Sequence, residues 1–357
     1  MLKEKRLLIV LIILLSIMTI GMGSKKDAVT TPEKKITWPL PPLEPKIEFV
    51  RSINKPDDLG IKKGFFKKLW EVIAGESENQ ITKPFGIAVD DKGKLYVTDT
   101  ASLSVHVFDQ INGNYNVIRE PERGMFVSPV GVDVDKKGNI FIADSILKRI
   151  YVFSEKGKYL RDLKPPADDL AFQRPTGIAI NREAGLLYIV DTIASKVHVY
   201  TTDGQYKFSF GEEGEGDGQF NHPTFIAVTK NGELHISDTL NFRVQIFDKN
   251  GKFISKFGKH GDGTGDMGNP RGIATDSDGN IYLVDTLFEA FQIFNRAGEL
   301  YLVIGKYGTG IGEFILPSGM VIDSNDNIYV ADTLNGRIQM FKYLKNHQNV
   351  ASPEQKQ

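Results

Sequence analysis

The sequence of 357 residues contains no cysteine. This absence excludes disulfide bonds, thiolate zinc sites, covalent haem attachment, a cysteine nucleophile and a lipid-modified N-terminal cysteine. With 41% hydrophobic and 25% charged residues, the composition is that of an ordinary folded protein. The fold must therefore be held together by burial and hydrogen bonding.

An excess of charge of one sign is also missing, because 44 lysine and arginine residues stand against 45 aspartate and glutamate residues. A net charge of −1 provides no overall basic field of the kind that drives sequence-independent nucleic-acid binding. We therefore expect no nucleic-acid partner.

The chain has one long hydrophobic run, from Leu7 to Ile20, and it follows the basic residues Lys3, Lys5 and Arg6. A basic start, an apolar run and the small residues of "GMGS" are typical of an export signal. The run is long for a cleaved signal and short for a membrane span, so cleavage after Gly23 and retention as an anchor both stay open. Either outcome makes residues 24–357 extracytoplasmic, whether secreted, periplasmic or membrane-anchored. Closely spaced prolines predict a solvated stalk over residues 24–45.

Two motifs repeat along the rest of the chain with one period. Pro-x-Gly begins at residues 84, 129, 175, 270 and 317, with Pro223-Thr224-Phe225 as a variant. An aspartate followed by threonine or serine recurs in phase, at Asp99, Asp144, Asp191, Asp238, Asp285 and Asp332. Each period of 45 to 48 residues also contains four short alternating segments separated by turn residues. The pattern predicts an all-β fold, a six-bladed β-propeller of four-stranded antiparallel blades over residues 46–343.

The sixth repeat supplies only three clear strands, and the tail 344–357 is predicted to be disordered. The alternating segment Lys46–Ile53 precedes the first repeat and matches the fourth strand of other repeats. We expect this N-terminal strand to close the ring, which leaves no long strand edge exposed. Residues 67–73 are an alternative closing strand.

The segments "LYVTDTASLSVHVFD", "LHISDTLNFRVQIFD" and "IYVADTLNGRIQMF" resemble NHL repeats. This resemblance implies the propeller fold, but it is weak for function, because NHL propellers include protein-binding scaffolds, RNA binders and a zinc-dependent amidating lyase. It also implies that the linkers before each Pro-x-Gly and the loops after each repeated aspartate share one face. That face would be the usual site of ligand engagement.

Three features suggest metal or phosphate chemistry, and each has a structural explanation. His222 precedes a repeat proline, but a catalytic zinc takes three protein ligands, and no other repeat has histidine at this position. "DSDGN" at residues 276–280 resembles half of a calcium loop, but it occupies a strand-to-strand turn and Leu287 stands where an EF-hand needs glutamate. Glycines 214, 261 and 308 recur in phase, as blade linkers do. The sequence thus predicts no metal, no cofactor and no catalytic residue.

The repeated aspartates are also predicted to be structural, accepting backbone N–H bonds from the adjoining loop. In four repeats a basic residue five positions later is expected to pair with the aspartate, as in Asp144 with Arg149 and Asp191 with Lys196. The other two expected pairs among these four are Asp238 with Arg243 and Asp332 with Arg337.

An enlarged loop at residues 54–80 contains the amphipathic stretch 60–76, with Phe65, Phe66 and Trp70 on one helical face beside lysines. We expect this insertion to cap the propeller, and contact with a membrane or a partner groove is the alternative.

The sequence as a whole predicts a non-catalytic, monomeric propeller that binds a protein or peptide. The predicted contacts are Lys83, Arg174, His222, Phe242, Asn269 and Arg271, together with Phe65, Phe66 and Trp70 of the insertion. The alternative is a metal-assisted lyase or hydrolase at the mouth of the channel. A third hypothesis, RNA binding, is opposed by the export signal and the acidic body.

Overall fold

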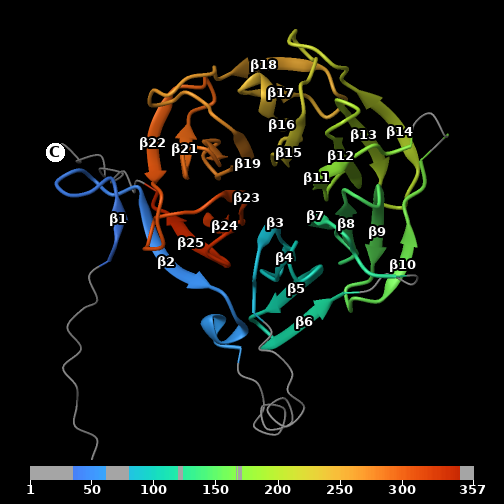
Figure 1. Ribbon diagram of the computed structural model, residues 1–357, viewed down its shortest axis with the longest axis horizontal. Helices are drawn as coiled ribbons and strands as arrows, with labels where there is room; N and C mark the ends of the chain where they lie inside the picture. Colours follow the sequence, from blue (N-terminus) through green and yellow to red (C-terminus); the bar gives the residue numbers. More distant parts are fainter. Residues whose placement is uncertain (1–34, 62–79, 120–123, 166, 168–170, 346–357) are drawn as a thin grey trace, which may run out of the picture. The chain divides into compact units, whose positions relative to one another are not determined.

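The computed structural model describes residues 35–61, 80–119, 124–165, 167 and 171–345 (Figure 1). These residues form β-strands and two short 3-10 helices, η1 (Pro56–Leu59) and η3 (Thr239–Asn241). Within this part of the chain no helix has the length and apolar character needed to span a bilayer. The predicted signal segment, the insertion residues Phe65, Phe66 and Trp70, and the tail from residue 346 lie outside the described residues.

The strands form six antiparallel blades around a central channel, which confirms the predicted six-bladed β-propeller (Figure 1). In each of the first five blades the first strand lies at the channel and the fourth at the rim. Blade 1 contains β3 (Pro84–Val89), β4 (Leu95–Asp99), β5 (Ser104–Asp109) and β6 (Asn114–Ile118). Blade 2 contains β7 (Pro129–Val134), β8 (Ile140–Asp144), β9 (Arg149–Phe153) and β10 (Tyr159–Asp162). Blade 3 contains β11 (Pro175–Asn181), β12 (Leu186–Asp191), β13 (Lys196–Thr201) and β14 (Tyr206–Phe210).

The remaining blades follow the same order. Blade 4 contains β15 (Pro223–Val228), β16 (Leu234–Asp238), β17 (Arg243–Phe247) and β18 (Phe253–Phe257). Blade 5 contains β19 (Pro270–Thr275), β20 (Ile281–Asp285), β21 (Ala290–Phe294) and β22 (Leu300–Gly305). Blade 6 begins with β23 (Pro317–Ile322), β24 (Asn327–Asp332) and β25 (Arg337–Tyr343).

The N-terminal strand β2 (Ile47–Ile53) completes blade 6, as the sequence predicts. It pairs antiparallel with β25, from Ile47 opposite Tyr343 to Ile53 opposite Ile338. The first and last strands of the propeller are therefore hydrogen-bonded, and the ring is closed. The short strand β1 (Thr37–Trp38), which falls in the segment expected to be a stalk, pairs with β2 as a fifth strand of this blade.

Glycine at the third position of Pro-x-Gly is required by the spacing between blades. A β-carbon on Gly86 would lie 2.2 Å from the carbonyl oxygen of Val130 in the next blade, and one on Gly131 would lie 2.0 Å from that of Thr176. These distances are shorter than any normal contact, so a side chain here would force neighbouring blades apart. Blade 4 departs from this pattern, because Phe225 takes the place of the glycine.

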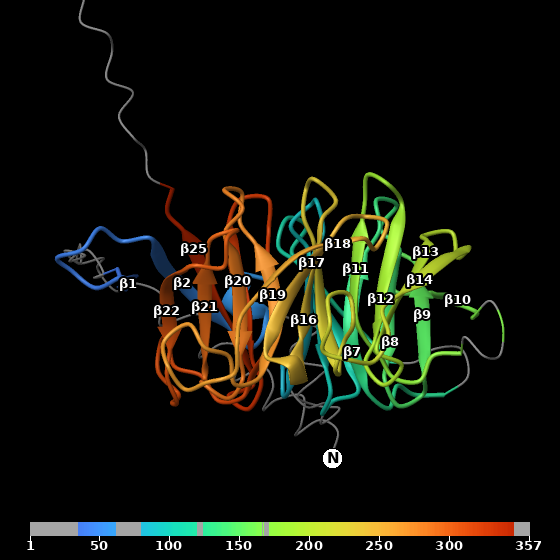
Figure 2. The ribbon, with the colours of Figure 1, turned by 90° about the horizontal axis from the view of Figure 1, so that it is seen from above.

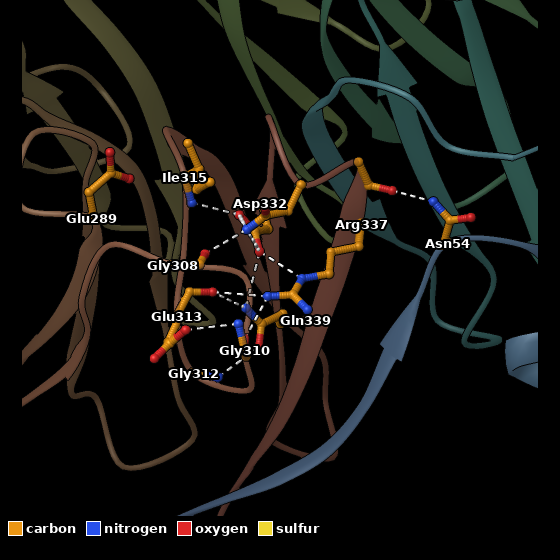
Figure 3. A network of polar contacts seen from close by, with 12 residues as sticks. Asn54, Glu289, Gly308, Gly310, Gly312, Glu313, Ile315, Asp332, Arg337 and Gln339 are labelled. Carbon is orange, nitrogen blue, oxygen red and sulfur yellow. Dashed lines mark hydrogen bonds and ion pairs between the residues drawn. The ribbon is translucent and has the colours of Figure 1, made fainter.

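The six repeated aspartates are fully buried and connect the second strand of each blade to the linker before it. Asp285, for example, accepts the backbone N–H groups of Gly268 and Asn269 at 2.7 and 2.9 Å. Asp332 accepts the N–H of Ile315 at 2.9 Å and is also bonded by Arg337 and Gln339 (Figure 3). The aspartates thus have the structural role that the sequence predicts.

The expected pairing of the aspartates with cations is only half right. Arg243 and Arg337 do contact Asp238 and Asp332, each through Nε at 2.7 Å. Arg149, however, pairs with Asp162 of the outer strand at 3.4 Å. The neighbour of Asp191 is His198, whose Nε2 lies 3.8 Å from Oδ2, instead of Lys196. The basic residue lies directly opposite its aspartate in all four blades, so the register alone does not decide the pairing. In blade 2 the carboxylate of Asp162 takes the arginine, and in blade 3 a buried imidazole lies beside the aspartate.

Removal of one of these carboxylates is expected to destabilise the fold. In Asp238→Ala the N–H of Asn221 and the buried Arg243 lose their acceptor, because they donate to Asp238 at 2.7 Å each. We expect the free energy of unfolding, measured by urea denaturation, to fall by about 3–5 kcal/mol. Asp203→Ala is the control, since Asp203 forms only an exposed pair with Lys137. Equal stability of Asp238→Ala and wild type would contradict the structural role.

His235 makes stability depend on pH. Burial, reinforced by the positive charge of Arg296, lowers the pKa of His235 to about 4. The unfolded chain therefore binds the proton more tightly, and stability that is complete above about pH 6.5 is lost as the pH falls towards 4. We expect wild type to lose about 2–3 kcal/mol more than His235→Leu between pH 7.5 and 4.5 in urea unfolding. Parallel pH profiles of the two proteins would refute this assignment.

Candidate functional site

Each inner strand begins with a proline that pairs directly with the aspartate at the end of the second strand, as Pro84 does with Asp99. The prolines and the aspartates therefore lie at the same end of the propeller. The linkers before the prolines and the loops after the aspartates therefore share one face, which we call the linker face. Figure 2 shows the ring from the side, with its loops gathered along the two edges. The hairpin turns between first and second strands occupy the opposite face.

A pocket of about 370 Å³ opens on the linker face at the mouth of the channel. Its lining comes from blades 1 to 5 and includes seven hydroxyl-bearing residues: Thr100, Ser128, Ser145, Thr176, Thr192, Thr224 and Thr239. The other lining residues are the apolar Phe85, Val130, Phe225 and Leu240 and the polar or basic Arg174, His222, Asn269 and Arg271. None of these lining residues is acidic.

Two phenylalanines from opposite blades form an aromatic surface in this pocket. The rings of Phe85 in blade 1 and Phe225 in blade 4 are stacked, with centroids 5.6 Å apart and an interplanar angle of 24°. Phe225 occupies the position that is glycine in the other five blades. The one irregular repeat motif therefore supplies half of the aromatic pair.

The far end of the channel is tied together by Arg182, which follows β11. Its guanidinium donates to the carbonyl oxygens of Val134 and Val89, at 2.8 and 2.9 Å, and to Asp133 at 3.0 Å. These bonds connect the first three inner strands. Burial raises the pKa of Asp133 against the opposing effect of the Arg182 charge, so this carboxylate depends on its arginine. The arginine here is neutralised, unlike those of the pocket.

Arg174 and Arg271 give the pocket a positive charge without a counterion. Arg271 Nε lies 3.2 Å from Asn269 Oδ1, and its Cζ lies 6.0 Å from the centroid of the Phe85 ring. No ion pair joins either arginine to another residue that the structure describes. Burial and the nearby positive charge of Arg174 lower the pKa of Arg271, although an arginine stays protonated. The pocket is therefore suited to an anionic group.

The hydroxyl that follows each aspartate mainly joins the blades. The side chains of Thr192, Thr239, Thr286 and Thr333 each donate to the carbonyl oxygen of the repeat proline in the next blade, at 2.6–2.9 Å. Blades 1 and 2 lack this link, since Thr100 donates to Lys83 and Ser145 donates to Ser128 of their own blades. The Asp-Thr motif thus fixes the walls of the pocket.

A ring of exposed aliphatic side chains surrounds the pocket, and the sequence analysis missed it. The ring consists of the residue two positions after the aspartate in blades 2 to 6: Ile146, Ile193, Leu240, Leu287 and Leu334, which are 46% to 66% exposed. Blade 1 has Ala101 at this position. The phase of these residues relative to the aspartates was the signal that could have revealed them.

Four of the predicted contact residues, Arg174, His222, Asn269 and Arg271, lie together in the pocket. Lys83 is exposed on the blade 1 linker but does not line the pocket. Phe242 is also absent from the lining: it ends η3 in the left-handed conformation, with φ 52°, and its ring packs 4.3 Å from that of His260. Phe65, Phe66 and Trp70 lie outside the described residues.

The surroundings of His222 do not resemble a metal site. Its Nδ1 lies 3.0 Å from the amide oxygen of Asn221, and its side chain is exposed. Nowhere in the described part of the chain do three histidine, aspartate or glutamate side chains converge as metal ligands would. At "DSDGN", Asp276 accepts the N–H groups of Asp278 and Asn280 at 2.9 Å each, in the turn between β19 and β20 where the sequence places it.

Comparison with known proteins supports the fold and leaves function open. A protein-family model described as "6-bladed beta-propeller" matches residues 226–291 and 267–346. No curated protein matches the sequence. Specific membership of the NHL family therefore stays an expectation.

Several solved structures share the propeller. They include a catalytically inactive virginiamycin B lyase from Staphylococcus aureus with quinupristin, which is 19% identical over 74% of this chain and 97% of that chain, with a TM-score of 0.54. Hydrazine synthase from Kuenenia stuttgartiensis is 12% identical over 74% and 97% of the two chains, with a TM-score of 0.51. A chain of a nidogen/laminin complex is 20% identical over 62% and 80%, with a TM-score of 0.52. At these identities the likeness extends to the fold alone.

The geometry of His222 predicts that the purified propeller holds no stoichiometric metal at this position. We expect elemental analysis of protein from Ser24 onward, prepared without affinity-tag histidines, to give the same metal content for wild type and His222→Ala. Chelator treatment should leave the melting temperature unchanged, because the aspartates and glycines that fix the fold need no ion. Stoichiometric metal that disappears in His222→Ala would contradict this prediction and favour a metalloenzyme.

Proposed function

We propose that this protein is an exported, non-catalytic propeller that binds a protein or peptide on its linker face. The observation that carries the proposal is the aliphatic ring around the pocket, Ile146, Ile193, Leu240, Leu287 and Leu334. Isolated exposed apolar residues are normal on protein surfaces, but a phased set around one opening is typical of an interaction site.

The fold itself does not require these aliphatic side chains. In blade 1, Ala101 occupies the ring position and its backbone N–H still bonds Asp99, at 2.9 Å. The equivalent N–H groups of Ile146 and Leu287 bond their own aspartates at 3.2 and 3.1 Å. The same backbone hydrogen bond thus forms with alanine at this position. The larger aliphatic side chains are therefore not needed to form the loop, and a stabilising role for them requires a contact outside the fold. Burial against a partner would provide it.

Catalysis at the same pocket is the alternative that the sequence leaves open. The lyase among the solved structures shows that the fold can carry an active site, although its likeness to this chain is one of fold. Among the described lining residues, His222 is the one imidazole, and no carboxylate lies beside it to act with it. A binding role needs none of this chemistry, which is why it is the better-supported proposal.

Disruption of the ring is expected to abolish binding without unfolding the protein. We predict that the triple variant Ile193→Asn, Leu240→Asn, Leu287→Asn loses at least about tenfold in affinity for peptides selected against wild type from a random display library, because three apolar contacts are lost. The measurement is fluorescence polarisation with the selected peptides. The melting temperature should stay close to that of wild type, since all three side chains are exposed.

The matched control places asparagine at three exposed aliphatic residues away from the linker face: Ile111, Leu160 and Ile254, in a hairpin turn and two outer strands. This variant should keep wild-type affinity. Equal loss in both variants, or full binding by the ring variant, would overturn the proposal. So would a selection that enriches no peptide over an unrelated protein.

A further inference from the structure

The pocket inside the aliphatic ring contains two arginines whose chemistry the proposed function leaves unexplained. Arg271 is the second residue of the repeat motif in blade 5. The same position in the other blades holds Phe85, Val130, Thr176, Thr224 and Ser318, none of which is charged. Arg174 is the residue before the repeat proline in blade 3. Arg271 is thus an exception at its repeat position, Arg174 takes a position that varies between blades, and both line the same pocket.

The charge on these arginines is not explained by folding. Arg182 at the far end of the channel and Arg243 behind Asp238 are saturated with acceptors, including a carboxylate each. Arg271, by contrast, donates to the amide oxygen of Asn269 at 3.2 Å, and it lines a pocket that has no acidic lining residue. A partly buried guanidinium without a counterion is costly, and an anion supplied by a ligand would offset that cost.

The surroundings favour a single carboxylate on an otherwise apolar ligand over a polyanion. The stacked pair of Phe85 and Phe225 and the side chain of Leu240 provide apolar contact next to the guanidinium groups. Exposed acidic residues on the neighbouring linkers, Glu213, Glu215 and Asp262, would repel a nucleic acid or another extended polyanion. The volume of about 370 Å³ is at the low end for ligand pockets, which are roughly 300–1,000 Å³, and suits one or two residues.

We propose that Arg271 and Arg174 bind a carboxylate, with the apolar side chain beside it packed on Phe85 and Phe225. In a peptide this carboxylate is the C-terminus, so the chain end enters the pocket and the preceding residues lie on the aliphatic ring. This assignment rests on the proposed function of the linker face, and it adds the chemistry that the centre of that face recognises. A small apolar carboxylic acid presents the same chemistry without a chain.

The test compares two pools of random octapeptides, one with free C-terminal carboxylates and one amidated, captured on immobilised wild-type protein and quantified by mass spectrometry. Three variants are run beside it. Arg271→Met keeps the apolar stem and removes the charge, Arg174→Gln removes the second charge, and Arg296→Gln is the control. Arg296 pairs with Glu233 on the opposite face of the propeller. The melting temperature of each variant confirms that it is folded.

The expected result is enrichment from the free-acid pool, at least about tenfold weaker binding of the same peptides when amidated, and a similar loss in Arg271→Met and Arg174→Gln, because a charge-assisted hydrogen bond is lost. Arg296→Gln should bind as wild type does. N-acetylleucine, measured separately by calorimetry, distinguishes the two sources of the carboxylate. Binding as tight as that of the peptides would support the inference with a small acid as ligand, and much weaker binding would support it with a chain end.

Two results would overturn the inference, and they differ in what they leave standing. Equal enrichment from both pools, unaffected by the arginine variants but lost in the ring variant, would reject the carboxylate and keep the linker face as a binding surface. No enrichment from either pool, together with no binding of N-acetylleucine, would reject the carboxylate and the peptide-binding function together.

Discussion

The fold and the pocket both depend on the buried carboxylate that ends the second strand of each blade. Burial disfavours the ionised form of a carboxylate. The charge is tolerated in this position because N–H groups donate hydrogen bonds to it. At Asp99, hydrogen bonds from His106 and from the backbone overcome that opposition and hold the pKa below its ordinary value. The donors come from the linker some 17 residues earlier. Each aspartate therefore fixes where the inner strand of its own blade begins, and with it the residues at the channel mouth.

The residues that obey the repeat build the scaffold and the walls of the pocket, and residues that depart from it supply half of its aromatic pair and the charge of Arg271. Glycine at the third motif position lets neighbouring blades approach, and its replacement by Phe225 brings an aromatic ring to the opposite Phe85. Arg271 likewise takes a position that is uncharged in the other blades, and Arg174 takes a variable linker position whose backbone N–H is held by Asp191. Because the repeat secures the backbone, a single exceptional side chain can change the chemistry of the mouth without changing the fold.

The period and the alternation were sufficient to predict six blades and the closing strand, because both features follow from local sequence and from the need to avoid an open edge. The pocket was predicted less completely. Arg174, His222, Asn269 and Arg271 were found as exceptions at loop positions, but the stacking of Phe85 on Phe225 joins blades about 140 residues apart and needs the closed ring. Phe242 was chosen as an exception at a loop position in the same way, but it lies outside the pocket lining and its ring packs on that of His260. The aliphatic ring was missed because a single exposed leucine does not indicate a binding surface. It becomes visible only when the residue two positions after each aspartate is compared across the blades.

The mouth of the channel is a preorganised site. Arg271 lies on strand β19, and the backbone N–H of Arg174 is held by Asp191 at 2.8 Å. The backbones of the two basic residues are thus fixed before any ligand arrives, and so are the threonines that link neighbouring blades. A site of this kind loses little conformational entropy on binding and selects ligands by shape and charge. The same rigidity keeps two like charges lining one cavity, so an anion bound there as we propose would gain part of its binding free energy by relieving a repulsion that the scaffold does not allow to relax.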